Sequence, residues 1–240
     1  MRHGEERAIS SLRCSNSLLL RFARRSIRGI LLNCTKQLAR VEGFEALLGS
    51  CISVSLEAGE RGAILAVAEG GTRACVQIGG QSCNVGLGSL CTPVLKYLEQ
   101  FFIAVKAAEA SNDVGLAEAS KRKLSTGLAT LAVIIKYLDG LAVDGNGTHP
   151  FAELLNVCWP MLQSIASYDP CRLHHDILQE LLGVHGKIVS SFGDIIEPKL
   201  GELINIVVQA YEEGYNRGCL DFVAVAAEKF GNRGGGVEER

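Results

Sequence analysis

The sequence predicts an all-α chain of antiparallel helix pairs, and three observations support this prediction. Apolar residues recur at spacings of three and four over most of the chain, as they do on one face of a helix. No convincing run of alternating apolar and polar residues competes with them. Helix signals recur so that two helices occupy about 40–47 residues, the period of HEAT-type repeats. We therefore expect a HEAT-like helical-repeat solenoid, an α-solenoid in which each pair packs on its neighbours.

The apolar stripes follow one another along the chain, and each predicts one helix. Several are wide enough to pack on two sides, which favours a solenoid over a closed bundle. The stripes are Ile27, Leu31, Cys34, Leu38 and Val41; Phe44, Leu47, Leu48 and Cys51; Leu95, Leu98, Phe102 and Val105; Leu124, Leu128, Leu131, Ile135 and Leu138; Phe151, Leu154, Leu155, Cys158, Leu162 and Ile165; Leu173, Ile177, Leu181, Val184 and Ile188; Ile196, Leu200, Leu203, Ile204, Val207 and Tyr211; and Leu220, Val223, Ala226, Ala227 and Phe230.

Turn residues divide the second half of the chain into four expected helices. Asp169-Pro170 suits a helix start, because aspartate is a favoured cap and proline is favoured in the first turn. Gly193-Asp194 is expected to end one helix and to open the next. Glycines at 214 and 231 stand where helices commonly end. The helices are expected at 148–168, 171–192, 194–212 and 215–230.

Residues 69–88, "EGGTRACVQIGGQSCNVGLG", form the most glycine-rich segment of the chain. They lack the Lys-Ser/Thr ending of a P-loop and the GxGxxG pattern of dinucleotide-binding folds. The segment "ACVQIGG" at 74–80 is the only strand-like fragment. We expect a flexible loop at 69–88 and no bound nucleotide.

The segment "GNGTHPFAELLNVCWP" at 145–160 places a proline inside an apolar helical pattern. The stripe passes through Pro160 without losing phase, so we expect one helix that bends there. His149 and Pro150 mark its start, and Trp159 is expected to be a packing anchor between neighbouring repeats.

Composition divides the chain into three parts. Residues 1–15 are expected to be a basic N-terminal segment, 16–231 the solenoid, and 232–240 a disordered tail. Residues 1–40 hold nine Arg and Lys but two acids. A transit peptide would also be basic, but Glu5 and Glu6 disfavour one, and the solvated face of a helix explains the same arginines. The net charge of −2 argues against a nucleic-acid binder, and "KRK" at 121–123 is too short to reverse this.

The nine cysteines are scattered, without a CxxC pair, and three of them lie on apolar stripes. We interpret them as reduced, buried side chains in a reducing compartment. The longest apolar segment, at 128–138, is interrupted by Lys136. We therefore expect no membrane span and no membrane association.

No pattern of a catalytic centre is present, so we expect no enzyme and no cofactor. One alternative is a metal-binding protein that uses residues clustered in sequence. Its ligands would be Cys171, His174, His175 and His185, of which His174 and His185 are expected on one helix face. Ordinary surface histidines explain the same positions.

The order of landmarks from residue 146 resembles the central segment of the transportin-SR/importin-13 group of nuclear transport receptors, in the importin-beta superfamily. The landmarks are Thr148-His149-Pro150, Trp159-Pro160, Gly186-Lys187, Glu197-Pro198, Cys219–Phe222 and Glu228–Gly231. Residues 26–58 resemble the segment just upstream. Together the two stretches cover about half of the chain. Such receptors are several times longer, so we expect this chain to be part of one.

The resemblance implies protein import into the nucleus by a receptor that shuttles between nucleus and cytoplasm. Such receptors bind a cargo protein inside the superhelix, FG-nucleoporins outside it, and the small GTPase Ran in its GTP form. Their Ran-binding end has no counterpart here. A standalone helical scaffold that binds proteins without transport is the alternative.

The helix that corresponds to 171–188 is arginine-rich in transportin-SR, where it takes phosphorylated Arg-Ser cargo, because guanidinium groups grip phosphate with two hydrogen bonds. In this chain Arg172 stands at one such position, whereas others hold Asp176, Gln179, Leu182 and Gly186. We expect that this chain does not recognise phosphorylated Arg-Ser cargo. The candidates for a cargo surface are Arg172, His175 and Lys187, and the structural landmarks are His149, Pro150, Trp159, Pro160 and Pro198.

Overall fold

The computed structural model describes residues 43–139, 141, 149–214 and 216–231, and all regular elements within them are helices. The prediction of an all-α chain is confirmed for this part. The segments expected at 1–15 and 232–240, and Thr148, lie outside the described residues. The elements are α3 (Phe44–Ala58), α4 (Arg61–Ile78), α5 (Gly80–Ala110), α6 (Val114–Leu138), α7 (Pro150–Ala166), α8 (Asp169–Arg172), α9 (His175–Ile196), the 3-10 turn η1 (Glu197–Lys199), α10 (Leu200–Gly214) and α11 (Arg217–Phe230).

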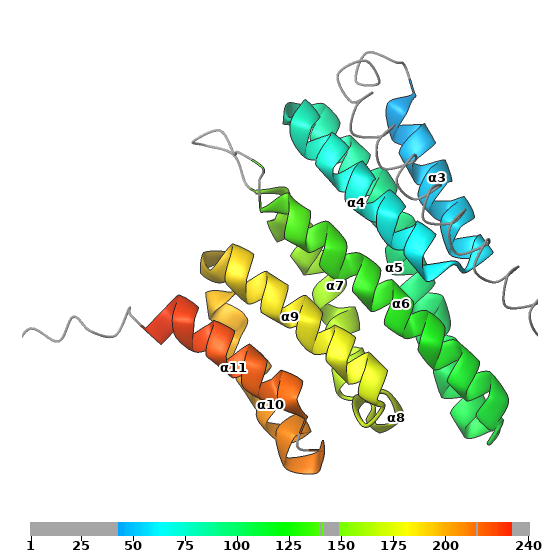
Figure 1. Ribbon diagram of the computed structural model, residues 1–240, viewed down its shortest axis with the longest axis vertical. Helices are drawn as coiled ribbons and strands as arrows, with labels where there is room; N and C mark the ends of the chain where they lie inside the picture. Colours follow the sequence, from blue (N-terminus) through cyan, green and yellow to red (C-terminus); the bar gives the residue numbers. More distant parts are fainter. Residues whose placement is uncertain (1–42, 140, 142–148, 215, 232–240) are drawn as a thin grey trace, which may run out of the picture.

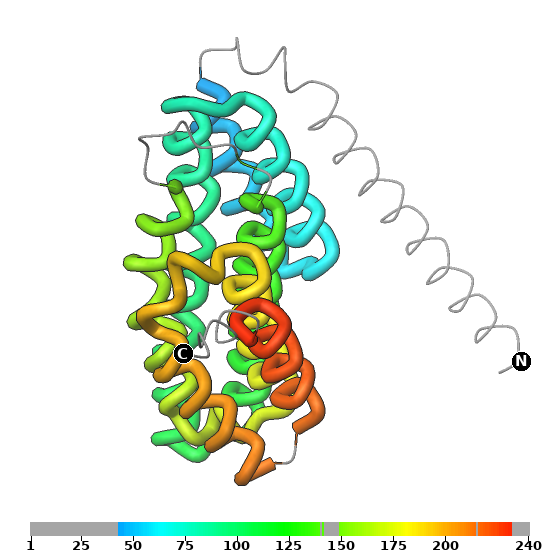
Figure 2. The backbone as a smooth tube through the Cα atoms, turned by 90° about the vertical axis from the view of Figure 1, so that its left-hand side faces the viewer, coloured from blue at the N-terminus to red at the C-terminus, as the bar shows by residue number. Residues whose placement is uncertain are grey.

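The long helices lie in two layers. Figure 1 shows α4, α6, α9 and α11 side by side, with α5, α7 and α10 behind them. Helix α3 packs on both α4 and α5 at one end of the stack. Figure 2 shows the two layers from the end where α10 and α11 lie. A single apolar core fills the space between the layers, and its members come from every long helix.

Short connections make α3 and α4, and likewise α5 and α6, antiparallel neighbours, as in αα-hairpins. Only Gly59 and Glu60 separate α3 from α4, and the N–H of Gly59 closes α3 on the carbonyls of Ser55 and Leu56. Asp113 begins α6, because its Oδ1 accepts a hydrogen bond of 3.0 Å from the N–H of Leu116.

The glycine-rich segment 69–88 is helical, so the prediction of a flexible loop is wrong. It forms the end of α4 and the start of α5, and the strand-like fragment at 74–80 belongs mostly to α4. Two of its glycines, Gly71 and Gly86, serve close packing. A Cβ on Gly71 would lie 3.2 Å from Leu48, and one on Gly86 would lie 2.8 Å from the Sγ of Cys75. The break between the two helices is confined to Gly79 and Gly80, whose φ angles are +69° and +57°.

Helix α7 continues through Pro160, which confirms one helix rather than two. Its start is also as expected: Pro150 is in the first turn, and the Nδ1 of His149 accepts a hydrogen bond of 3.0 Å from the N–H of Phe151. Proline removes one backbone hydrogen bond and crowds the preceding turn. Pro160 is exposed, and Ser164 donates from Oγ to its carbonyl at 2.8 Å.

The expected boundaries around α9 and α10 need correction. Residues Asp169–Arg172 form the separate turn α8, so the next helix starts at His175. The expected break at Gly193-Asp194 is a local distortion at Phe192 (φ −130°, ψ 36°), and α9 continues to Ile196. The ring of Phe192 stacks on Phe151 at 4.0 Å between ring centroids, which holds the distorted turn against α7. Pro198 lies in η1, and α10 starts after it.

The cysteines of the described residues are free, and all except the half-buried Cys51 are buried. Burial raises the thiol pKa of Cys91, Cys158 and Cys171 to about 12, because the charged thiolate loses its solvation in the core. These side chains are therefore neutral, packed groups and poor nucleophiles. No helix in the described ranges is long and apolar enough to cross a bilayer.

The packing role of the glycines predicts opposite effects for two alanine substitutions. In Gly127→Ala, the new Cβ would lie 2.7 Å from the buried Leu98, so the free energy of unfolding should fall by about 1–3 kcal/mol. In Gly88→Ala, the Cβ meets no atom within 4 Å, and the helix should gain up to about 1 kcal/mol. Urea denaturation measures both values. Equal effects of the two substitutions would contradict the close-packing explanation.

Candidate functional site

A groove lies between α9 and α11, and we call it the α9–α11 groove. Its volume is about 690 Å³, within the range of about 300–1,000 Å³ typical of ligand sites. The residues that line it are His175, Gln179, Leu182, Gly183, Gly186, Lys187 and Ser190 from α9, and Gly214, Asn216, Arg217, Gly218, Asp221, Phe222 and Val225 from α10, α11 and their connection.

Helix α9 lies between α6 and α11, and its sequence places different residues on its different faces (Figure 1). Residues at 177, 181, 184 and 188 are apolar and fully or almost fully buried. Residues at 175, 179, 183 and 187 are exposed at intervals of four, so they form one ridge along the helix. This ridge is one wall of the α9–α11 groove.

Two glycines give the α9–α11 groove its open wall. A Cβ built on Gly183 or Gly186 would meet no atom within 4 Å, so the space beside the α9 backbone is free. The absence of side chains lets the backbone of a bound segment approach closely. By contrast, Gly218 on the opposite wall is constrained, since a Cβ there would lie 3.1 Å from Leu182.

The first turn of α11 forms the opposite wall. The Oδ1 of Asn216 accepts a hydrogen bond of 2.8 Å from the N–H of Gly218 and caps the helix. This start directs Arg217 and Asp221, one turn apart and both exposed, along the groove. Charges of both signs therefore line the groove, with Lys187 and Arg217 opposed by Asp221.

Two of the three expected cargo-surface residues lie in the α9–α11 groove. His175 and Lys187 are both exposed and belong to the α9 ridge. The third prediction, Arg172, is wrong as a surface residue, because its side chain is only 8% exposed. Its Nη2 lies 2.7 Å from Asp169 Oδ1, and its Nη1 lies 2.6 Å from Glu213 Oε2. Arg172 therefore joins α8 to the end of α10.

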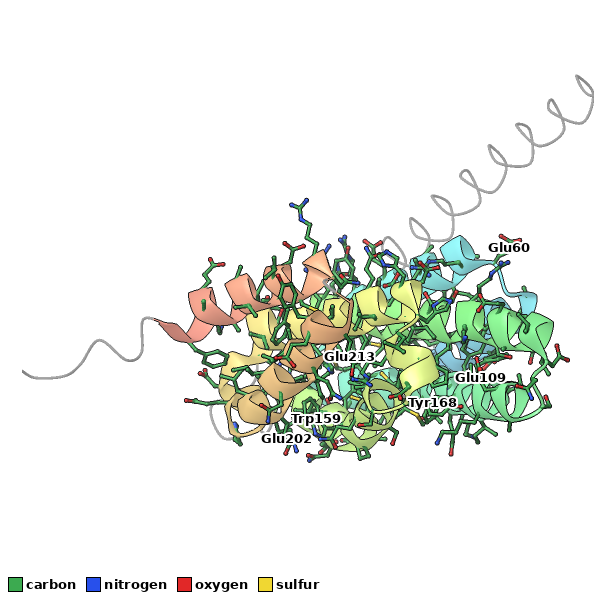
Figure 3. All side chains as sticks on the ribbon, turned by 90° about the horizontal axis from the view of Figure 1, so that it is seen from below. Glu60, Glu109, Trp159, Tyr168, Glu202 and Glu213 are labelled. Atoms are coloured by element: carbon green, nitrogen blue, oxygen red, sulfur yellow. The ribbon has the colours of Figure 1, made fainter. Side chains whose placement is uncertain are left out.

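The landmark Trp159 is buried and contacts two other elements. Its Nε1 donates a hydrogen bond of 3.3 Å to the Oε2 of Glu202 on α10. Both residues are labelled in Figure 3. The indole centroid lies 6.0 Å from that of His185 on α9, and the Nζ of Lys199 lies 5.1 Å from the ring. These contacts tie α7 to α9 and α10, so Trp159 is a packing residue.

The four ligands of the metal alternative point to different surroundings. Cys171 is fully buried in α8, and His175 opens into the α9–α11 groove. His174 precedes α9 and places its Nε2 3.5 Å from Glu118 on α6, whereas His185 packs beside Trp159. No group of three or more His, Cys, Asp or Glu side chains in the described residues is arranged to hold a metal ion. The structure therefore does not bring the four ligands of the metal alternative together.

Sequence reasoning missed the α11 wall of the groove. The signal available was weak: Arg217 and Asp221 are polar residues four apart on a short helix, a common arrangement on solvated faces. Their importance depends on α11 packing beside α9, forty residues earlier in the chain, and periodicity within one helix does not specify its neighbour.

Comparison of the chain with protein-family models, with curated proteins and with solved structures finds no match.

The buried position of His185 predicts a specific dependence of stability on pH. Loss of solvation lowers its pKa from 6.5 to about 4, so the folded protein keeps it neutral where the unfolded chain protonates it. The unfolded state binds more protons below pH 6.5, and stability must fall as the pH decreases toward 4. His185→Leu should abolish about 3 kcal/mol of this fall in the free energy of unfolding between pH 6.5 and 4, since one pKa unit corresponds to about 1.36 kcal/mol.

Chemical denaturation of wild type and His185→Leu between pH 7 and 4 measures this difference. His175→Leu is the control, because it removes an exposed histidine from the same helix, and its curve should follow the wild type. Parallel curves for wild type and His185→Leu would show that His185 is not held neutral in the folded protein.

A second pair of variants separates the structural arginine from the groove. Arg172→Met removes a buried guanidinium that contacts two carboxylates, so the free energy of unfolding should fall by about 2 kcal/mol. Lys187→Met removes an exposed side chain of similar length, and the change should stay within about 0.5 kcal/mol. Thermal and urea denaturation test both values, and equal stability of the two variants would contradict the role given to Arg172.

Proposed function

We propose that this chain is a segment of a HEAT-like α-solenoid that binds a partner protein in the α9–α11 groove. The observation that carries the proposal is an open groove walled by two successive helices of one layer, with open glycines on the α9 wall and charged side chains on both walls. A stack of helix pairs presents such grooves between neighbouring repeats, and repeat proteins commonly bind partners along them.

The chemistry of the groove favours an extended protein segment. The open backbone at Gly183 and Gly186 admits the main chain of a peptide, and Gln179 and Ser190 offer polar groups beside it. Lys187 and Arg217 suit isolated carboxylates. A dense phosphorylated segment fits less well, because the described groove has no array of guanidinium groups, and Asp221 would repel phosphate.

The wider role proposed is protein import into the nucleus. It rests on the resemblance of residues 26–58 and 146–231 to transportin-SR and importin-13. In this proposal the groove holds a cargo protein, FG-nucleoporins bind the outer face, Ran-GTP releases the cargo, and the receptor shuttles between cytoplasm and nucleus. A protein-binding scaffold without transport activity is the second candidate, because the same groove would serve it equally well.

Filling the groove provides the direct test. Gly186→Leu places a side chain in the open space beside α9 and improves helix propensity, so the protein should stay folded. Gly201→Leu on α10 is the matched control, because a Cβ there also meets no atom within 4 Å and Gly201 does not line the groove. Proteins captured from a nuclear and cytoplasmic extract should then be purified and titrated against each variant.

We expect at least one purified partner to bind Gly186→Leu about tenfold more weakly than wild type or Gly201→Leu, a difference of about 1.4 kcal/mol. Equal affinity for all three proteins would contradict binding in the groove. A synthetic Phe-Gly repeat peptide on beads separates the two candidate functions, since retention of the chain supports the transport receptor and its absence supports the scaffold.

A further inference from the structure

The helix pair α10 and α11 exposes apolar side chains besides those that it buries in the core. On α10, Ile204 and Val208 are 41% and 46% exposed. On α11, Leu220 and Val223 are 54% and 48% exposed. Helical spacing extends both stripes by one residue each. We call the surface that they form the α10–α11 face, and its residues are Ile204, Val208, Tyr211, Leu220, Val223 and Ala227.

The stripe of α10 lies on the side of that helix opposite to α7. The Oε2 of Glu202 accepts hydrogen bonds from Trp159 and Gln163, so Glu202 marks the side of α10 that faces α7. A helix turns by about 100° per residue, which places Ile204 and Val208 about 160° and 120° from Glu202. Both side chains therefore point away from α7.

The stripe of α11 lies opposite to α9 by the same reasoning. Gly218 marks the side that faces α9, because a Cβ on it would lie 3.1 Å from Leu182. Leu220, Val223 and Ala227 lie about 160°, 140° and 180° from Gly218 around the helix. Since α7 and α9 precede this pair in the two layers, both stripes open at the same end of the described stack (Figure 1). An apolar patch of this kind marks an interaction site.

The side chains of the α10–α11 face are arranged by size. Only two residues separate the end of α10 from the start of α11, so the two helices are antiparallel neighbours. Counted from this connection, Tyr211 lies beside Leu220, and Ile204 lies beside Ala227. The bulkier pair is therefore near the connection, and the smaller pair is at the other end of the face.

This arrangement suits a second copy of the same face, related by a two-fold axis at right angles to the helices. Each helix then packs antiparallel on its own counterpart. Leu220 faces Ala227 of the second copy, and Tyr211 faces Ile204 of the second copy. A two-fold axis parallel to the helices would place Tyr211 against Leu220 of the second copy and hold the two faces apart at the other end. Close packing favours the first arrangement.

The charges at the edge of α11 are also self-complementary. Arg217 and Glu228 are exposed and stand eleven residues apart, which is about three turns, so they lie at opposite ends of one edge. Neither forms an ion pair with another described residue. In the antiparallel arrangement, Arg217 of each copy faces Glu228 of the other. Two ion pairs then flank the apolar contact, which favours this orientation on encounter.

We propose that two copies of this chain associate through the α10–α11 face, with each α11 antiparallel to the other. The face spans helices of 15 and 14 residues, or about 20 Å by 20 Å. The contact of about 400 Å² per copy is at the low end for specific interfaces, so the dimer is reversible. The proposal does not rest on the function of the α9–α11 groove, because the residues of the α10–α11 face do not line it.

Sedimentation velocity of the full-length chain at about 1 to 100 µM tests the association. The mass should rise with concentration from 25.7 kDa toward twice that value. Leu220→Glu places a carboxylate in the contact, so the dissociation constant should rise at least about tenfold. Leu116→Glu on α6 is the matched control, because Leu116 is 51% exposed, and it should dimerise as wild type does. Thermal denaturation verifies that both variants fold.

Three results would overturn the proposal. The first is a chain that stays monomeric throughout this range, which would leave the face to a different occupant. The second is an equal loss of association in Leu116→Glu and Leu220→Glu. The third is growth beyond the dimer, because a closed two-fold contact leaves no free copy of the face.

Charge reversal tests the orientation of the two copies. Arg217→Glu and Glu228→Arg each bring like charges together, so each should raise the dissociation constant about threefold. The double variant restores both ion pairs with their signs reversed, and its dissociation constant should return to that of wild type. Losses that add in the double variant would contradict the antiparallel pairing of α11.

Discussion

The described fold depends on the burial of one continuous apolar layer between two layers of helices. Every long helix contributes to this core, and each packs on at least two other elements. Close approach of the helices is therefore required, and glycine and other small residues permit it at the crossings of α3, α4 and α5. The same constraint leaves the polar faces, such as the α9 ridge, directed outward.

The ion pairs and hydrogen bonds between helices add specificity to this packing. Arg172 spans from α8 to α10, Trp159 from α7 to α10, and Arg61 contacts Glu180 from α4 to α9. Each interaction joins elements that lie far apart in sequence, so it can form only when the layers are correctly aligned. Exposed pairs such as Arg61 with Glu180 contribute little stability by themselves, whereas the buried Arg172 requires its partners.

The candidate site could be predicted in part from the sequence. His175 and Lys187 were expected on a surface, and the structure places both on the exposed ridge of α9, where helical periodicity decides which residues share a face. Arg172 was expected on the same surface because the resemblance to transportin-SR places it at a position that takes cargo in that group. The chain instead begins a new helix at His175, and the preceding turn carries Arg172 into the protein. The spacing of apolar residues does not report a change of chain direction, so it could not predict the turn between residues 172 and 175.

The sequence by itself determined the all-α class, the positions of most helices and the passage of α7 through Pro160, because apolar periodicity and caps are local properties of the chain. Only the tertiary structure decided the meaning of the glycines at 69–88 and the pairing of α9 with α11. Glycine permits both a loop and a close helix crossing, and the choice between them depends on whether a neighbouring side chain, such as Leu48 beside Gly71, lies within contact distance. The α9–α11 groove likewise exists because two faces meet that no local pattern connects.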